Sequence, residues 1–211
     1  MRKLILIVWL LTPVAAAAYH LGPGQDQVRL DDAASAIRAG KRHVERALEQ
    51  TESEGDLAAK SEWAQAEEAF RDALELLPED RTDERQRVRL ERAKAQMMIS
   101  QLPAANAELS SLVQELSSDE NADPKLVRDA RRAYANSQYY VTWLMRLEGQ
   151  PRERWEPEIE VARQTFKLLA EELDQVGDSR GRANAEEDLE SAIRLARMNL
   201  TDLQGLPLPS Q

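Results

Sequence analysis

The chain has 211 residues, of which 28 are Lys or Arg and 38 are Asp or Glu, so its formal net charge at pH 7 is -10. This acidic balance excludes a general electrostatic attraction to nucleic acid or to an anionic membrane surface. Because the chain contains no cysteine, disulfides, thiolate metal sites and thiol catalysis are also excluded.

The first 18 residues have the three parts of a secretory signal peptide. Arg2 and Lys3 form a basic start, residues 4–11 are an unbroken apolar run, and residues 15–18 are alanines. Small residues at the end of such a run are typical of a signal-peptidase site. We therefore expect residues 1–18 to be removed and the mature chain to be exported, either to the periplasm or to the medium.

An uncleaved membrane anchor is the alternative interpretation of this segment. The apolar stretch 4–18 contains Pro13 and is shorter than the span of about 20 residues that a membrane-crossing helix needs. The sequence therefore favours cleavage after Ala17 or Ala18 and no direct membrane insertion of the mature chain. Residues 19–29, which include two glycines and a proline, are expected to form a flexible lead-in.

From residue 30 to residue 204, apolar residues recur about every three or four positions, which is the period of one face of a helix. This pattern predicts an all-α domain. We expect seven helices, at about residues 30–51, 57–77, 83–101, 104–116, 124–147, 153–176 and 182–203. Short connections make consecutive helices antiparallel neighbours. The tail, residues 205–211, is short, contains two prolines and is expected to be extended.

Two features predict how the first three helices pack. Gly40 lies inside an apolar stripe, where the missing side chain would let another helix approach closely. Residues 49–80 are strongly acidic and residues 81–94 are mainly basic, so packing them side by side relieves repulsion. The helix at residues 83–101 carries two apolar stripes, one with Leu90, Ala93 and Met97 and the other with Val88, Ala95 and Met98.

The segment at residues 63–80, WAQAEEAFRDALELLPED, closely resembles the second helix of a tetratricopeptide (TPR) repeat. The small, aromatic, alanine and terminal proline positions of that family fall on Ala66, Phe70, Ala73 and Pro78. The spacing of the first three positions recurs in two later helices, at Ala105/Leu109/Leu112 and Ala162/Phe166/Leu169. The resemblance implies three stacked TPR-like hairpins and a C-terminal capping helix. The alternative is an irregular helical bundle.

The helix at residues 124–147 carries the candidate binding residues. Arg132, Asn136, Tyr139 and Trp143 share one side of it at helical spacing. In TPR-like proteins the first helices of the pairs line a concave groove, and groove asparagines and arginines commonly hold a peptide, so the resemblance implies that these four residues face a ligand. Aromatic residues and arginine are also enriched in binding hot spots. The alternative is that this helix lies in the middle of the stack and is buried on both sides.

Two further motifs imitate catalytic or metal sites. Residues 177–181, GDSRG, resemble a nucleophile motif around Ser179, but such a serine normally needs a basic partner such as histidine, and the turn between two helices explains the same residues. Residues 119–123 imitate the start of a calcium-binding loop, yet Pro124 and Ala130 stand where that loop needs glycine and glutamate. We expect no metal and no cofactor.

These observations predict a non-enzymatic scaffold of the cell envelope that binds a protein or peptide partner, and not nucleic acid, through a groove lined by first helices. One alternative is a membrane-tethered structural helical protein. The other, weaker alternative is an exported hydrolase that uses Ser179 or a glutamate.

Overall fold

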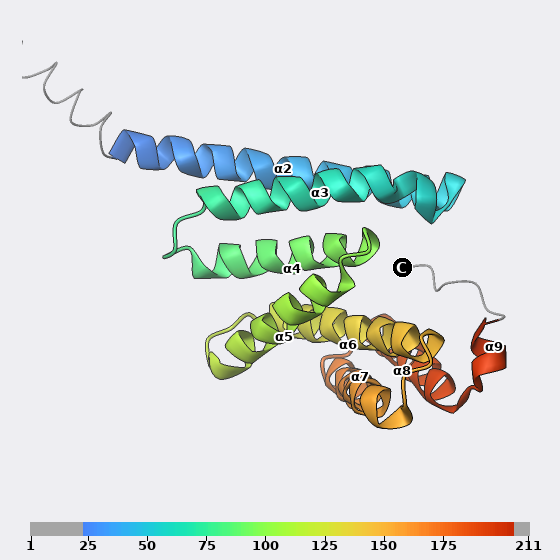
Figure 1. The fold of residues 1–211 in the computed structure, drawn as a ribbon. Coiled ribbons are helices and arrows are strands. Elements are labelled where there is room, and N and C mark those ends of the chain that lie inside the picture. Colours follow the sequence, from blue (N-terminus) through green and yellow to red (C-terminus); the bar gives the residue numbers. More distant parts are fainter. Residues whose placement is uncertain (1–22, 205–211) are drawn as a thin grey trace, which may run out of the picture.

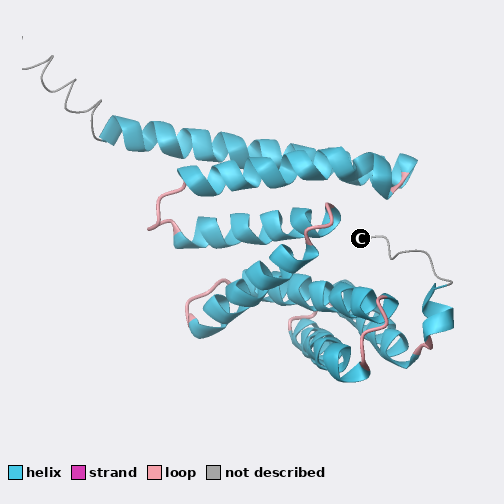
Figure 2. Cartoon of the chain, viewed as in Figure 1, coloured by secondary structure: helices cyan, strands magenta, loops and turns pink. Residues whose placement is uncertain are grey.

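A computed structural model describes residues 23–204. The expected signal peptide (1–18), the first part of the expected lead-in (19–22) and the tail (205–211) lie outside the described residues. Within the described range the regular elements are all helices and no strand is present (Figure 2). The helices are α2 (Pro23–Glu54), α3 (Asp56–Leu76), α4 (Thr82–Met98), α5 (Leu102–Ser118), α6 (Pro124–Leu147), α7 (Arg152–Gln175), α8 (Ser179–Arg197) and α9 (Leu200–Gln204).

Each helix from α2 to α7 packs against the next one along the chain. Figure 1 shows α2, α3 and α4 side by side, with α5 to α8 grouped beneath them. Two longer-range contacts join α4 to α6 and α6 to the short helix α9. Of the helices described, none combines the length and apolar character needed to cross a membrane.

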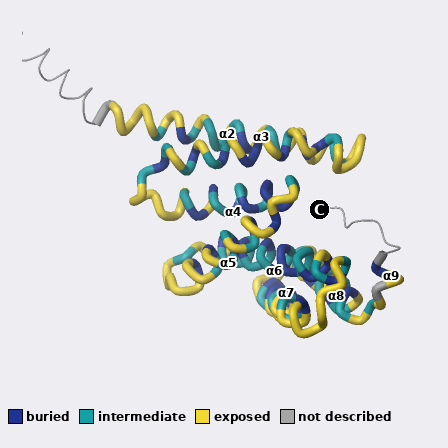
Figure 3. Tube along the Cα trace, viewed as in Figure 1, coloured by how far each residue is buried: buried dark blue, intermediate teal, exposed yellow. Residues whose placement is uncertain are grey.

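The interior is divided into three apolar clusters rather than one. Figure 3 marks the buried residues in dark blue, and they alternate with exposed ones along the helices. The first lies among α2, α3 and α4, the second among α4, α5 and α6, and the third among α6, α7, α8 and α9. The two predicted stripes of α4 separate between clusters: Val88 and Ala95 belong to the first, while Leu90 and Ala93 belong to the second. Because α4 and α6 each contribute to two clusters, they connect the whole stack.

Helices α2 and α3 approach each other closely at Gly40. A Cβ atom at this position would lie 2.6 Å from Cε1 of Phe70, and that ring is 1 % exposed. The prediction that Gly40 admits a neighbouring helix is therefore confirmed, and the neighbour is α3.

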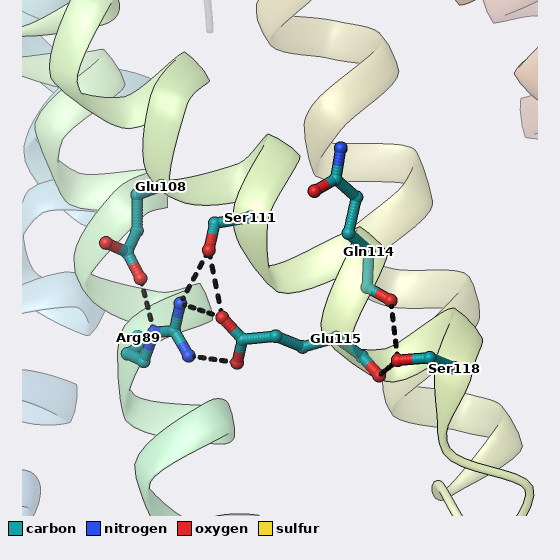
Figure 4. A network of polar contacts seen from close by, with 6 residues as sticks. All are labelled: Arg89, Glu108, Ser111, Gln114, Glu115 and Ser118. Carbon is teal, nitrogen blue, oxygen red and sulfur yellow. Dashed lines mark hydrogen bonds and ion pairs between the residues drawn. The ribbon is translucent and has the colours of Figure 1, made fainter.

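Oppositely charged residues link α3 to α4 and α4 to α5. The Arg92 Nε atom donates to Glu67 Oε1 at 2.8 Å, as the charge pattern of residues 49–94 predicts. Figure 4 shows Arg89 of α4 between two carboxylates of α5, with Glu108 on one side and Glu115 on the other. Its Nη1 and Nη2 atoms donate to the two oxygens of Glu115 at 2.5 and 2.9 Å, a paired geometry that fixes one helix against the other.

The largest differences from the expected helices lie at the two ends of the described range. Helix α2 begins at Pro23, so residues 23–29 of the expected flexible lead-in are helical; proline suits a first turn because that position needs no backbone donor. The expected last helix, 182–203, begins earlier, at Ser179, and is divided into α8 and α9. It breaks because Met198 has an extended backbone. The Arg146 guanidinium donates to the carbonyls of Leu195 and Met198 at this break.

Candidate functional site: a groove lined by α2, α4 and α6

Two adjoining cavities lie along the same three helices. The first, of about 400 Å³, is mainly apolar and is called here the apolar cavity; its lining comes from α2, α3, α4 and α6, namely Leu48, Trp63, Lys94, Met97, Met98, Asp129, Arg132, Ala133, Asn136 and Tyr140. The second, of about 490 Å³, is the charged cavity; it is lined by α2, α4 and α6, namely Ile37, Lys41, Glu84, Arg87, Val88, Leu90, Glu91, Asp123, Lys125, Leu126 and Asp129. Because both include Asp129, we treat them as one groove.

The walls of the apolar cavity combine a buried aromatic ring with more exposed aliphatic side chains. Trp63 is 7 % exposed and forms part of the first apolar cluster, whereas Leu48 at the opening is 49 % exposed. Met97 and Met98 come from adjacent positions of α4. Methionine side chains adapt to irregular apolar partners, so this wall suits the insertion of an apolar side chain.

Polar groups of α6 border the same cavity. The Arg132 Nη2 atom donates to the carbonyl of Gly181 at 3.2 Å, and among residues 23–204 no carboxylate forms an ion pair with Arg132. The partly buried Asn136 amide has no hydrogen-bond partner in the same range. Burial raises the pKa of the Tyr140 hydroxyl to about 12, so Tyr140 stays neutral at physiological pH.

The charged cavity is bordered by one ion pair between α4 and the N-cap of α6 and by one ion pair within α6. Arg87 Nη2 lies 3.1 Å from Asp123 Oδ2, and Lys125 Nζ lies 2.6 Å from Asp129 Oδ2. Asp123 also caps α6 by accepting a hydrogen bond from the Lys125 backbone N–H at 2.9 Å. That bond, with help from Arg87, lowers the pKa of the Asp123 carboxyl. Lys41 on the opposite wall forms no ion pair within the described residues.

The four predicted site residues fall into two groups. Arg132 and Asn136 line the apolar cavity. Tyr139 instead packs against the third apolar cluster, and Trp143, which is 5 % exposed, belongs to that cluster. The structure therefore does not bring Trp143 to the groove, because α7 and α8 pack over this side of α6. The alternative of a helix buried on both sides describes Tyr139 and Trp143 better.

Sequence reasoning missed most of the groove on α2, α3 and α4, including Leu48, Trp63 and Lys94. One signal was available, namely a stripe of mixed charged and apolar residues with helical spacing on each of three alternating helices. On α6 this stripe passes through Asp129, Arg132 and Asn136 and reaches Tyr140 rather than Tyr139.

The segment around Ser179 forms a helix start. Ser179 is exposed, and Asp178 Oδ1 accepts a hydrogen bond from the Gly181 N–H at 2.8 Å, which makes Asp178 the N-cap of α8. A Cβ at Gly181 would lie 2.5 Å from Oδ2 of the same carboxylate, so a larger residue here would require the Asp178 side chain to shift. His43 is engaged elsewhere, between α2 and α3, where its Nδ1 lies 2.7 Å from Glu62 Oε2.

The loop before α6 is held by its own backbone and by α4. Asp119 Oδ1 accepts the N–H of Asn121 at 2.9 Å, while Asp123 is used as a cap and as the partner of Arg87. Over the described range, no group of three or more His, Cys, Asp or Glu side chains is arranged to hold a metal ion.

The geometry thus offers an open surface with an apolar recess, polar donors and charged walls, which suits non-covalent binding. No protein-family model, curated protein or solved structure matches this chain.

Proposed function

We propose that this chain is a non-enzymatic scaffold that binds a protein or peptide partner in the groove lined by α2, α4 and α6. The observation that carries the proposal is the position of the two adjoining cavities along three alternating helices. The lining side chains come mainly from α2, α4 and α6, and α3 adds Trp63 to the apolar cavity.

A TPR-like arrangement explains this alternation. In the proposed arrangement α2/α3, α4/α5 and α6/α7 are three hairpins, and α8 caps the stack. The burial of the repeated motif supports it, because a small residue followed by a large one suits close helix packing. The motif residues exposed by 1 % or less are Ala66, Phe70, Ala73, Ala105, Leu109, Leu112, Ala162, Phe166 and Leu169.

We also propose that the scaffold acts in the cell envelope after export and cleavage near Ala17 or Ala18. The support is the basic, apolar and small-residue order of residues 1–18. N-terminal sequencing of the mature protein tests it. A start near Tyr19 agrees with cleavage, whereas a start at Met1 would favour the membrane-tethered alternative.

Photo-crosslinking in the native host tests the groove directly. A photoreactive amino acid would replace Leu48 in the apolar cavity and, as a matched control, Leu168 on the outer side of α7; the two leucines are 49 % and 43 % exposed. We expect a discrete crosslinked product at position 48 that is absent at position 168. No product at position 48, or the same products at both positions, would contradict the proposed groove.

The same products should disappear when Asn136→Ala is combined with the photoreactive group at position 48, because Asn136 borders the same cavity. Its partly exposed amide has no hydrogen-bond partner among the described residues, so the substitution should leave the fold intact. Circular dichroism of the variant checks that the helices remain.

A further inference from the structure

We infer that the groove receives an internal acidic segment of its partner, with one apolar side chain inserted between Trp63 and the methionines of α4. This inference rests on the proposed function and adds the chemistry of the partner. It follows from three properties of the groove: its apolar recess, its unusual balance of charge and the distribution of its basic residues.

The apolar cavity determines what kind of partner side chain can be inserted. Trp63, Met97 and Leu48 form its walls, and the cavity of about 400 Å³ is large enough for a side chain of the size of leucine, methionine or phenylalanine. Leu48 is the exposed part of this wall, and an inserted side chain would remove it from water. Burying an apolar side chain of this size is favourable and would place the partner's backbone at the opening.

The charge balance of the groove is opposite to that of the whole chain. The two cavities contain five of the 28 basic residues but four of the 38 acidic ones. An acidic segment would be repelled by most of this protein, whereas here it meets a slight excess of positive charge. Lys41 and Arg132 have no ion-pair partner among residues 23–204, so both have donors available to carboxylates of a partner.

The basic residues are spread along the groove rather than gathered at one point. Lys94 and Arg132 border the apolar cavity, and Lys41, Arg87 and Lys125 border the charged one. Lys94, Arg87 and Lys125 each pair with a carboxylate of the groove itself. Arg132 in the apolar cavity and Lys41 in the charged one are therefore the two positions that a partner's carboxylates would meet first. A single terminal carboxylate would meet one of these positions. Several Asp or Glu side chains along a continuous segment would meet more of them, so complementarity favours an internal segment.

Selection from a library of random peptides tests this inference and needs no purified partner. The intact chain would be panned against displayed peptides of about 12 residues, which span about 40 Å when extended. We expect enrichment of peptides that combine a large apolar residue with two or more acidic residues. A selected peptide would then be synthesised with an amidated C-terminus, and we expect its affinity to be unchanged by that amidation.

Matched variants locate the binding. Leu48→Asp should lower the affinity for the selected peptide by about tenfold or more, as expected for an anchor position. Leu168→Asp should leave this affinity unchanged. The double variant Lys41→Gln/Lys94→Gln should lower the affinity for the peptide by about fivefold. The control Lys167→Gln, at an exposed position of α7, should leave the affinity unchanged. Thermal melting of each variant separates loss of binding from loss of folding.

The outcomes distinguish this inference from the proposed function. Enriched peptides that are neutral or basic but sensitive to Leu48→Asp would overturn the acidic partner and keep the scaffold. Loss of binding on amidation would overturn the internal segment. Acidic peptides that are insensitive to the two lysine substitutions would overturn the charge argument. Failure to select any peptide sensitive to Leu48→Asp would overturn both the inference and the proposed groove.

Discussion

Replacing Gly40 with alanine tests the packing of α2 against α3. The added Cβ would lie 2.6 to 2.8 Å from three atoms of the Phe70 ring, which is closer than carbon atoms approach without repulsion. The ring is almost completely buried and belongs to the cluster that also contains Trp63 and Leu77. It therefore has little room to move away.

Two opposing effects determine the result. Alanine in place of glycine inside a helix stabilises it by about 1 kcal/mol. Forcing an extra methyl group into a filled core costs about 1–3 kcal/mol, and three short contacts with one rigid ring place this position near the upper limit. We expect the free energy of unfolding to fall by about 2 kcal/mol, which corresponds to a decrease in Tm of about 4–8 °C for a chain of this size.

Thermal and urea unfolding, followed by circular dichroism, measure this loss. Ser35→Ala, at an exposed position of the same helix, is the control: it measures how much the higher helix propensity of alanine raises the stability where no clash occurs. In a Phe70→Leu background, Gly40→Ala should become neutral or stabilising, because the ring is no longer present. If Gly40→Ala raises Tm in the otherwise unchanged chain, the close approach of α2 and α3 is wrong.

Three further substitutions test the core, a charge network and a helix cap. Trp143→Ala should lower the free energy of unfolding by about 3–5 kcal/mol because it empties a core position, while Asn136→Ala should leave it unchanged; urea unfolding of both variants shows whether Trp143 is structural. Hydrogen bonds from Arg89 lower the pKa of Glu115 in the folded chain. Glu115 therefore contributes to the free energy of unfolding above its unfolded pKa of about 4.3. This contribution is lost as the pH falls through the lowered pKa of the folded chain. The difference in Tm between the original chain and Glu115→Gln should therefore shrink between pH 5 and pH 3, and a constant difference would contradict this pairing. Asp178→Ala removes the N-cap of α8 and should cost about 1 kcal/mol in urea unfolding.

The sequence predicted most of the helices because their apolar periodicity is local. Residues 83–101 illustrate the reason: two stripes on one helix require neighbours on two sides, and Leu90 and Val88 do enter different clusters. The close approach at Gly40 was predictable for the same reason. An apolar stripe faces a neighbouring helix, and a glycine within that stripe lets the neighbour come closer.

The site was predicted less well because residue type does not reveal which side of a helix remains uncovered. Tyr139 and Tyr140 are adjacent and chemically identical, yet they are separated by about 100° around α6, and only Tyr140 lines the apolar cavity. Tryptophan is common both in binding hot spots and in protein cores, so the residue type of Trp143 does not distinguish the two roles. Its role is decided by α7 and α8, which follow it in the chain and pack over it.

The division of the interior among separate clusters has a consequence for how this sequence can vary. The buried residues of α2 and of α8 each pack within a single cluster. A substitution in either helix can therefore be compensated by a second substitution within the same cluster. Substitutions in α4 and α6 affect two clusters at once. These two helices therefore have the least freedom to diverge, and the same restriction holds the groove-lining residues that they carry in fixed positions relative to one another.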